Sequence, residues 1–155
     1  MTVDELGDYG VKSMTDEEVT GYLASHSVGV LALPADGAPS MRPLSFAFEG
    51  DCLYFLYVVG NGSRKAELTD HADRARFLVY SAETPFNWRS VLLAGTIDEV
   101  SDDEETAARD ALRGAWRPDV FEQAGDAETV RLYRFDIDER TGLKHLGLPP
   151  GFEDG

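Results

Sequence analysis

Short apolar runs, several of them alternating with polar residues, recur along the chain and predict strands. They cover residues 28–33, 40–48, 52–59, 74–82, 88–100 and 129–139. Alternation of apolar and polar positions is typical of strands that bury one face. Residues 91–94 are apolar on both faces, so we expect the fifth strand to be central. The pattern predicts a mainly β protein, a six-stranded antiparallel barrel in meander order with a few short helices.

Two capping boxes predict where helices begin. Thr15 is followed three residues later by Glu18, and Ser101 is followed at the same spacing by Glu104. This spacing lets a hydroxyl and a carboxylate satisfy the first backbone N–H groups of a helix. We expect the second helix to run to about Arg113.

One domain accounts for most of the chain. The barrel is expected to span residues 15–148, with its last strand ending at residue 139 and irregular structure after it. Residues 1–14 are polar and aperiodic, so we expect a loose arm there. Residues 149–155 begin with Pro-Pro-Gly and are expected to form a tail.

The chain is strongly acidic, with 29 Asp and Glu against 14 Lys and Arg and a formal net charge of -15. This charge argues against nucleic acid and anionic membranes as partners, because both require a basic surface. The sequence shows no membrane span and no signal peptide, and Cys52 is its single cysteine. We therefore expect a cytoplasmic protein without an internal disulfide.

Three windows of the chain contain no acidic residue but do contain cations. Residues 37–48 hold Arg42, residues 52–66 hold Arg64 and Lys65, and residues 84–97 hold Arg89. Buried strands exclude carboxylates, but they exclude arginines as well. A bound anion explains both halves of the pattern.

The middle window reads as a strand, a loop with two glycines and the start of a helix. Ser63 is a good N-cap residue, and it places Arg64 and Lys65 in the first helical turn. Cations are unfavourable at that end of a helix, unless an anion such as phosphate binds the free N–H groups there. The stretch alone leaves open the alternative of a solvated polar turn with an ordinary serine cap.

Several motifs in sequence order resemble one known family. They are VGVLALxxDGxP, RPLSF, LYF, GSRKAxL and WRSVLLAGT, between residues 15 and 102. In this order they resemble the pyridoxamine 5'-phosphate oxidase-like family of flavin-binding split barrels. The resemblance implies a six-stranded split β-barrel, a homodimer, and one FMN at each of two clefts between the subunits.

The resemblance also implies which residues contact the cofactor. Arg64 and Lys65 would hold the FMN phosphate beside Ser63, and Arg42 would reach the phosphate or ribityl end. The other implied contacts are Pro43, Leu44 and Ser45 along the isoalloxazine, Leu56 and Tyr57 along the ribityl chain, the polar pair Arg89 and Ser90, and Trp116 with Phe121 from the second subunit.

The sequence also departs from the family pattern. The loop at residues 58–62 is longer than in the oxidases, and Asp70-His71-Ala72 replaces the usual Asn-Pro. The Trp- and Arg-Leu-containing motif with which true pyridoxamine oxidases end is absent from residues 142–150. We therefore do not expect oxidation of pyridoxamine phosphate.

The resemblance favours an FMN-dependent oxidoreductase, more a reductase than a vitamin oxidase, that acts on a small molecule. NAD(P)H or a deazaflavin coenzyme would be the electron donor. Two alternatives stay open: a flavin-binding, stress-related protein without its own turnover, and a barrel that binds an anion other than flavin.

Other reactive residues have simpler interpretations. His26, His71 and His145 lack the spacing of metal ligands, so we expect no metal site, although haem ligation by one of them stays open. Cys52 lies on a strand, where a packed thiol is the usual role. Trp88 would either stack on a flavin or fill the mouth of the barrel.

Because self-repulsion in a chain of net charge -15 is screened by salt, we expect the fold to weaken as salt is removed. The unfolding temperature should fall when potassium chloride is lowered from about 1 M to about 10 mM. A constant unfolding temperature over this range would contradict the prediction.

Overall fold

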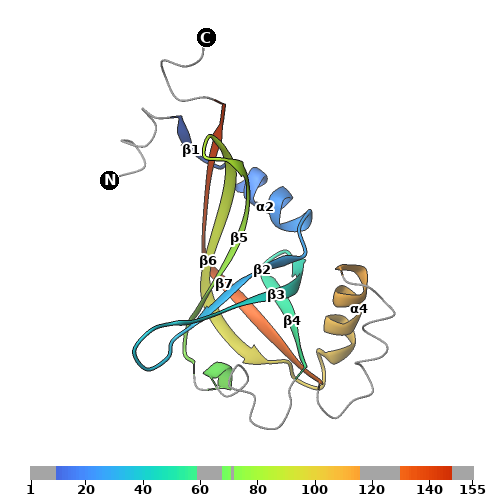
Figure 1. Cartoon of the computed structure of the whole chain (residues 1–155). Coiled ribbons are helices and arrows are strands. Elements are labelled where there is room, and N and C mark those ends of the chain that lie inside the picture. Colours follow the sequence, from blue (N-terminus) through green and yellow to red (C-terminus); the bar gives the residue numbers. More distant parts are fainter. Residues whose placement is uncertain (1–9, 59–67, 71, 116–129, 148–155) are drawn as a thin grey trace.

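The computed structural model describes residues 10–58, 68–70, 72–115 and 130–147 (Figure 1). Its elements, in chain order, are β1 Val11–Ser13, α2 Asp16–Ala24, β2 Val28–Leu33, β3 Ser40–Glu49, β4 Cys52–Val58, β5 Ala75–Thr84, β6 Asn87–Glu99, α4 Glu105–Ala115 and β7 Val130–Leu146. Among the described residues, no helix is both long and apolar enough to span a bilayer.

Strands β2 to β7 close into one antiparallel barrel, and β1 adds a short edge strand to β7. The order of neighbours is β1-β7-β4-β3-β2-β5-β6, and β6 returns to pair with β7. The predicted mainly β class and the six antiparallel strands are confirmed. The predicted meander order is wrong, because β5 pairs with β2. Both edges of β4 are taken by β3 and β7, so the next strand forms at the free edge of β2.

Aromatic side chains fill the centre of the barrel. Phe46, Phe55, Phe77 and Phe135 are at most 1 % exposed, and their rings meet at centroid distances of 5.1 to 6.2 Å. These tilted and edge-to-face contacts are the arrangement that aromatic rings prefer. The long central strand predicted from the sequence is β6, which pairs along its length with β5 and β7.

Helix α2 packs against β3, β6 and β7 and begins as its capping box predicts. The Thr15 hydroxyl accepts a hydrogen bond from the Glu18 N–H, and the Glu18 carboxylate accepts one from the Thr15 N–H. The helix buries Val19 among the core residues. A Cβ on Gly142 of β7 would lie 2.7 Å from the Val19 side chain, so glycine at this position lets the helix approach the strand.

Helix α4 covers the outside of β3 and β4 and begins at Glu105, later than the second capping box predicts. The Glu104 carboxylate accepts hydrogen bonds from Arg134 at 2.8 Å and from Tyr54 at 3.1 Å. It is therefore used to tie the start of α4 to β7 and β4, and it does not fold back onto Ser101.

Strand β7 continues to Leu146, although the sequence predicts its end at residue 139. The extension pairs with β6 on one side and with β1 on the other. Pairing to a long neighbour keeps this polar segment extended, which its own composition does not predict. The predicted loose arm is ordered at its end, where Val11–Ser13 forms β1.

Cys52 is buried at the start of β4, in the cluster of apolar residues beneath α4. Burial raises the pKa of its thiol, which disfavours the reactive thiolate. The predicted role as a packed thiol is confirmed.

Tyr57 makes the fold sensitive to alkali. It is fully buried, and burial raises its pKa to about 12, whereas an unfolded tyrosine titrates near pH 10. The unfolded chain therefore loses its proton first, and stability falls as pH rises from about 10 to about 12. We expect Tyr57→Phe to lose less free energy of unfolding than the wild type between about pH 8 and about pH 11, measured in urea. An equal loss in both proteins would contradict this.

Candidate functional site

Strands β3 and β4 diverge within the barrel wall. They are paired from Glu49–Cys52 to Phe46–Phe55. Beyond that point β3 pairs with β2, and β4 pairs with β7, but they no longer pair with each other. We call this opening, between residues 40–45 of β3 and residues 56–58 of β4, the split. Strand edges without a partner leave backbone N–H and C=O groups for a ligand.

The β3 side of the split carries four of the predicted cofactor contacts. Pro43 lies there and pairs with Val30 of β2, and no described strand pairs with it on the other side. Leu44 is buried in the core, Ser45 is half-buried, and Arg42 is exposed. Arg42, the cation of β3, therefore exposes its guanidinium group to solvent beside the split.

The β4 side of the split carries Leu56 and Tyr57, whose side chains both make contacts within the protein. Leu56 packs beneath α4. Tyr57 is buried in the barrel, and its hydroxyl lies 3.0 Å from that of Thr69. Only the backbone of these two residues is left for a ligand in the split.

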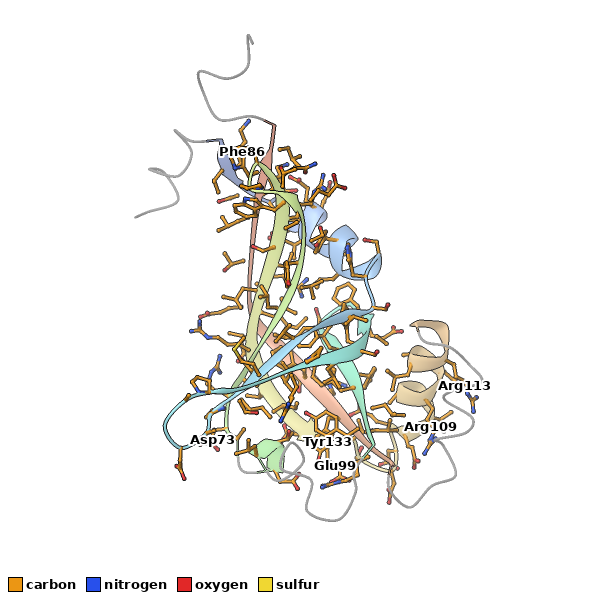
Figure 2. All side chains as sticks on the ribbon, viewed as in Figure 1. Asp73, Phe86, Glu99, Arg109, Arg113 and Tyr133 are labelled. Carbon is orange, nitrogen blue, oxygen red and sulfur yellow. The ribbon has the colours of Figure 1, made fainter. Side chains whose placement is uncertain are left out.

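The short helical segment at residues 68–70 is held against the barrel by Asp70. Arg131 donates to both Asp70 carboxylate oxygens at 3.1 Å, and its Nη2 donates to Glu99 at 2.6 Å. The Tyr133 hydroxyl donates to the same Asp70 carboxylate at 2.9 Å. Figure 2 shows Glu99 and Tyr133 close together at this end of the barrel. Hydrogen bonds to Glu99 and Asp70 raise the pKa of Arg131 above its usual range. The network fixes the end of the helix that Ser63 is predicted to begin.

This network was missed in the sequence. Asp70 is separated from Arg131 by 61 positions and from Tyr133 by 63, and it shares no motif with them. The usable signal is the alternation of Arg131 and Tyr133 in the last strand, but nothing in that pattern identifies Asp70 as their partner.

Arg89 and Ser90 do not point to the same place. They are neighbours on β6, so their side chains lie on opposite faces of the sheet. Arg89 lines a hollow beside α2, whereas Ser90 is paired with Tyr80 on the outward face. The structure therefore does not bring the predicted polar pair together on one side of the barrel wall.

The outward face of β2, β3, β5 and β6 is apolar and open to solvent. Val28, Met41, Tyr80 and Leu92 are 56, 60, 59 and 37 % exposed, respectively. They alternate along their strands with residues of the barrel core. We call this surface the outer apolar face. An exposed apolar patch of this kind marks a surface for another protein or a ligand.

Another hollow, with a volume of about 610 Å³, lies at the base of the β2–β3 connection. Arg74, Arg76 and Glu139 line it, and none of the described cofactor contacts predicted above does. Arg74 pairs with Asp138 at 2.7 Å, so its charge is already matched.

Several predicted residues lie outside the described residues. These are Ser63, Arg64, Lys65, His71, Trp116 and Phe121. Of the other histidines, His26 caps α2, because its Nδ1 lies 2.7 Å from the Tyr22 carbonyl oxygen. His145 lies within β7 and is 6 % exposed, and the structure thus corrects the irregular structure predicted after residue 139.

Solved structures share this fold and define the class of protein. A FAD-binding protein from Mesorhizobium loti has a TM-score of 0.71 at 22 % identity, covering 86 % of this chain and 97 % of that one. A FAD and haem binding protein from Mycobacterium smegmatis has a TM-score of 0.73 at 20 % identity, covering 94 % and 78 %. A flavocytochrome from Azotobacter vinelandii has a TM-score of 0.69 at 21 % identity, covering 94 % and 73 %. The chain is a split β-barrel.

The family follows from the sequence match. The family model named pyridoxamine 5'-phosphate oxidase matches residues 15–144. The match covers most of the chain, so this protein belongs to the pyridoxamine 5'-phosphate oxidase-like family, as its motifs predicted. No curated protein sequence matches it.

Proposed function

We propose that the protein binds a flavin nucleotide as a homodimer, with one flavin at each of two clefts between the subunits. The observation that carries this proposal is the split, an open strand edge in a member of this family, with exposed Arg42 on one side of β3 and the outer apolar face on the other. The split supplies the backbone groups, Arg42 supplies charge, and the outer apolar face supplies a second surface.

The described residues fit a flavin. Its isoalloxazine ring is flat and largely apolar, with polar edges that backbone N–H and C=O groups can hydrogen-bond. Residues 42–45 offer such groups along an edge that no described strand covers. Ser90 lies on the outward face beside exposed Tyr80. These residues would hold and orient the ring.

The proposal for where the phosphate of the flavin nucleotide binds is based on the sequence. Arg64 and Lys65 lie in an acid-free window at a predicted helix start, behind the Ser63 cap. The network around Asp70 supports this proposal, because it fixes residues 68–70 just beyond that stretch. FMN, with one phosphate, is the nucleotide that this stretch favours. FAD is the alternative, since proteins of the same fold bind it.

When bound, the flavin would supply the electron transfer, and the protein would bind the cofactor and shape the space for a small-molecule substrate. We propose a cytoplasmic reductase that takes electrons from NAD(P)H or a deazaflavin coenzyme. Residues 142–146 support a role other than pyridoxamine phosphate oxidation, because they are used in pairing with β6 and β1. Reduction of the bound flavin by a donor and its reoxidation by a substrate would distinguish a reductase from a protein that only stores flavin. A Soret band in the spectrum of the purified protein would reveal haem.

If Ser63, Arg64 and Lys65 hold a phosphate, the protein should bind FMN at least about a hundredfold more tightly than riboflavin, which lacks the phosphate. Arg64→Ala together with Lys65→Ala should remove most of this preference and leave riboflavin affinity nearly unchanged. Quenching of flavin fluorescence measures all four affinities.

Arg109→Ala together with Arg113→Ala is the matched control, because it removes the same charge from α4 and should keep the preference for FMN. Equal affinity of the wild type for FMN and riboflavin would remove the phosphate site. FAD binding more tightly than FMN would keep the flavin proposal and change the nucleotide.

If the outer apolar face forms the dimer, a carboxylate placed on it should separate the subunits, because burying an unpaired charge is costly. We expect wild type at high salt to have twice the mass of the 17.0 kDa chain in light scattering, and Tyr80→Glu to shift towards one chain's mass. Ala107→Glu adds the same charge to the exposed side of α4 and should leave the dimer intact. A monomeric wild type would overturn the proposal.

A further inference from the structure

We propose that the groove between α2 and the β5–β6 hairpin is a second binding site, for a small organic monocarboxylate. The hollow has a volume of about 430 Å³ and lies on the face of β6 opposite Ser90, so it is separate from the outer apolar face. The inference does not depend on flavin binding.

Arg89 is the cation of this groove. Its side chain is half-buried, and within the part of the chain that the structure describes it has no ion-pair or hydrogen-bond partner. Such an arginine is unexpected in a chain with 29 acidic residues, because so many carboxylates are available to pair with it. A planar guanidinium with free N–H groups matches a carboxylate in a two-point contact.

The charges around the groove favour a single negative charge on the ligand. Glu18 also lines the groove, but Lys144 bonds to its carboxylate and lowers its pKa. Lys144 lies between Lys12 of β1 and Arg89 of β6 in the register of the sheet. Glu18 therefore neutralises Lys144, and among the described residues Arg89 is left as the free charge inside the groove. A dianion such as phosphate would meet this single arginine, of the residues described, and the nearby Glu18 carboxylate.

Hydroxyl groups complete the polar side of the groove. The Tyr22 hydroxyl donates to Ser81 Oγ at 2.9 Å, which leaves the Ser81 hydrogen free to be donated to a ligand. Ser81 is directly opposite Arg89 in the pairing of β5 and β6, so both donors point to the same side of the sheet.

The remaining walls suit the apolar body of an organic acid. The rings of Tyr22 and His26 lie with their centroids 4.0 Å apart and form one continuous surface, and the Met14 side chain also lines the groove. His26 Nδ1 lies 2.7 Å from the Tyr22 carbonyl oxygen, which only accepts, so Nδ1 carries a hydrogen and the ring is held in place. An aromatic or branched aliphatic carboxylate would place its charge at Arg89 and its body against these rings.

Benzoate is a suitable probe, because it combines one carboxylate with an apolar ring. Calorimetric titration of the purified protein at constant ionic strength, with potassium benzoate replacing potassium chloride, should give saturable binding at roughly millimolar concentration. Arg89→Gln should weaken this binding at least about tenfold. Arg113→Gln makes the same charge change on α4, far along the chain, and should bind as the wild type does.

Ser81→Ala keeps the arginine and should weaken benzoate binding about threefold, which tests the site if Arg89→Gln fails to fold. Benzoate binding that is unchanged in either variant would overturn the proposal, as would the absence of saturation in the wild type by about 50 mM. Inorganic phosphate binding as tightly as benzoate would also overturn it, because the groove would then not select a monocarboxylate.

Discussion

The divergence of β3 from β4 beyond the Phe46–Phe55 pair is the constraint on which the rest of the structure depends. Up to that pair, phenylalanine rings of both strands share the barrel centre and hold the ladder together. Past it, each strand keeps only its other neighbour, and the wall opens without losing the barrel, because β6 pairs with β7 on the far side. Closure at one place thus permits an open strand edge at another, where a ligand can meet the backbone.

Contacts of β4 and β7 with residues 69–70 stabilise the open edge. Tyr57 continues β4 beyond the divergence and is fixed by burial and by its contact with Thr69. Arg131 and Tyr133 then hold Asp70, one residue further on. Exposed ion pairs contribute little singly, but a two-point arginine–carboxylate contact that shares a tyrosine fixes geometry as well as adding energy. The segment after β4, with the predicted phosphate contacts, is therefore tied to the barrel at its far end.

The alternation of side chains along a strand separates functions that the sequence places together. Arg89 and Ser90 are adjacent in one motif, yet one residue faces the hollow beside α2 and the other faces outward. The same alternation buries Leu44 in the core and leaves Pro43 exposed on the outward face. One wall of the barrel thus offers two surfaces with different chemistry, one apolar and open and one polar and closed by a helix.

The sequence by itself determined most of the strands, the α2 capping box and the family, because local patterns and motif order carry that information. Only the tertiary structure decided the strand order. Strands β3 and β7 occupy the two edges of β4, and β5 therefore pairs with β2. The extension of β7 and the burial of His145 likewise follow from long-range pairing with β6 and β1. The partners of Asp70 and the place of Arg89 in the hollow beside α2 were also decided there, because contacts between distant residues leave no local pattern in a single chain.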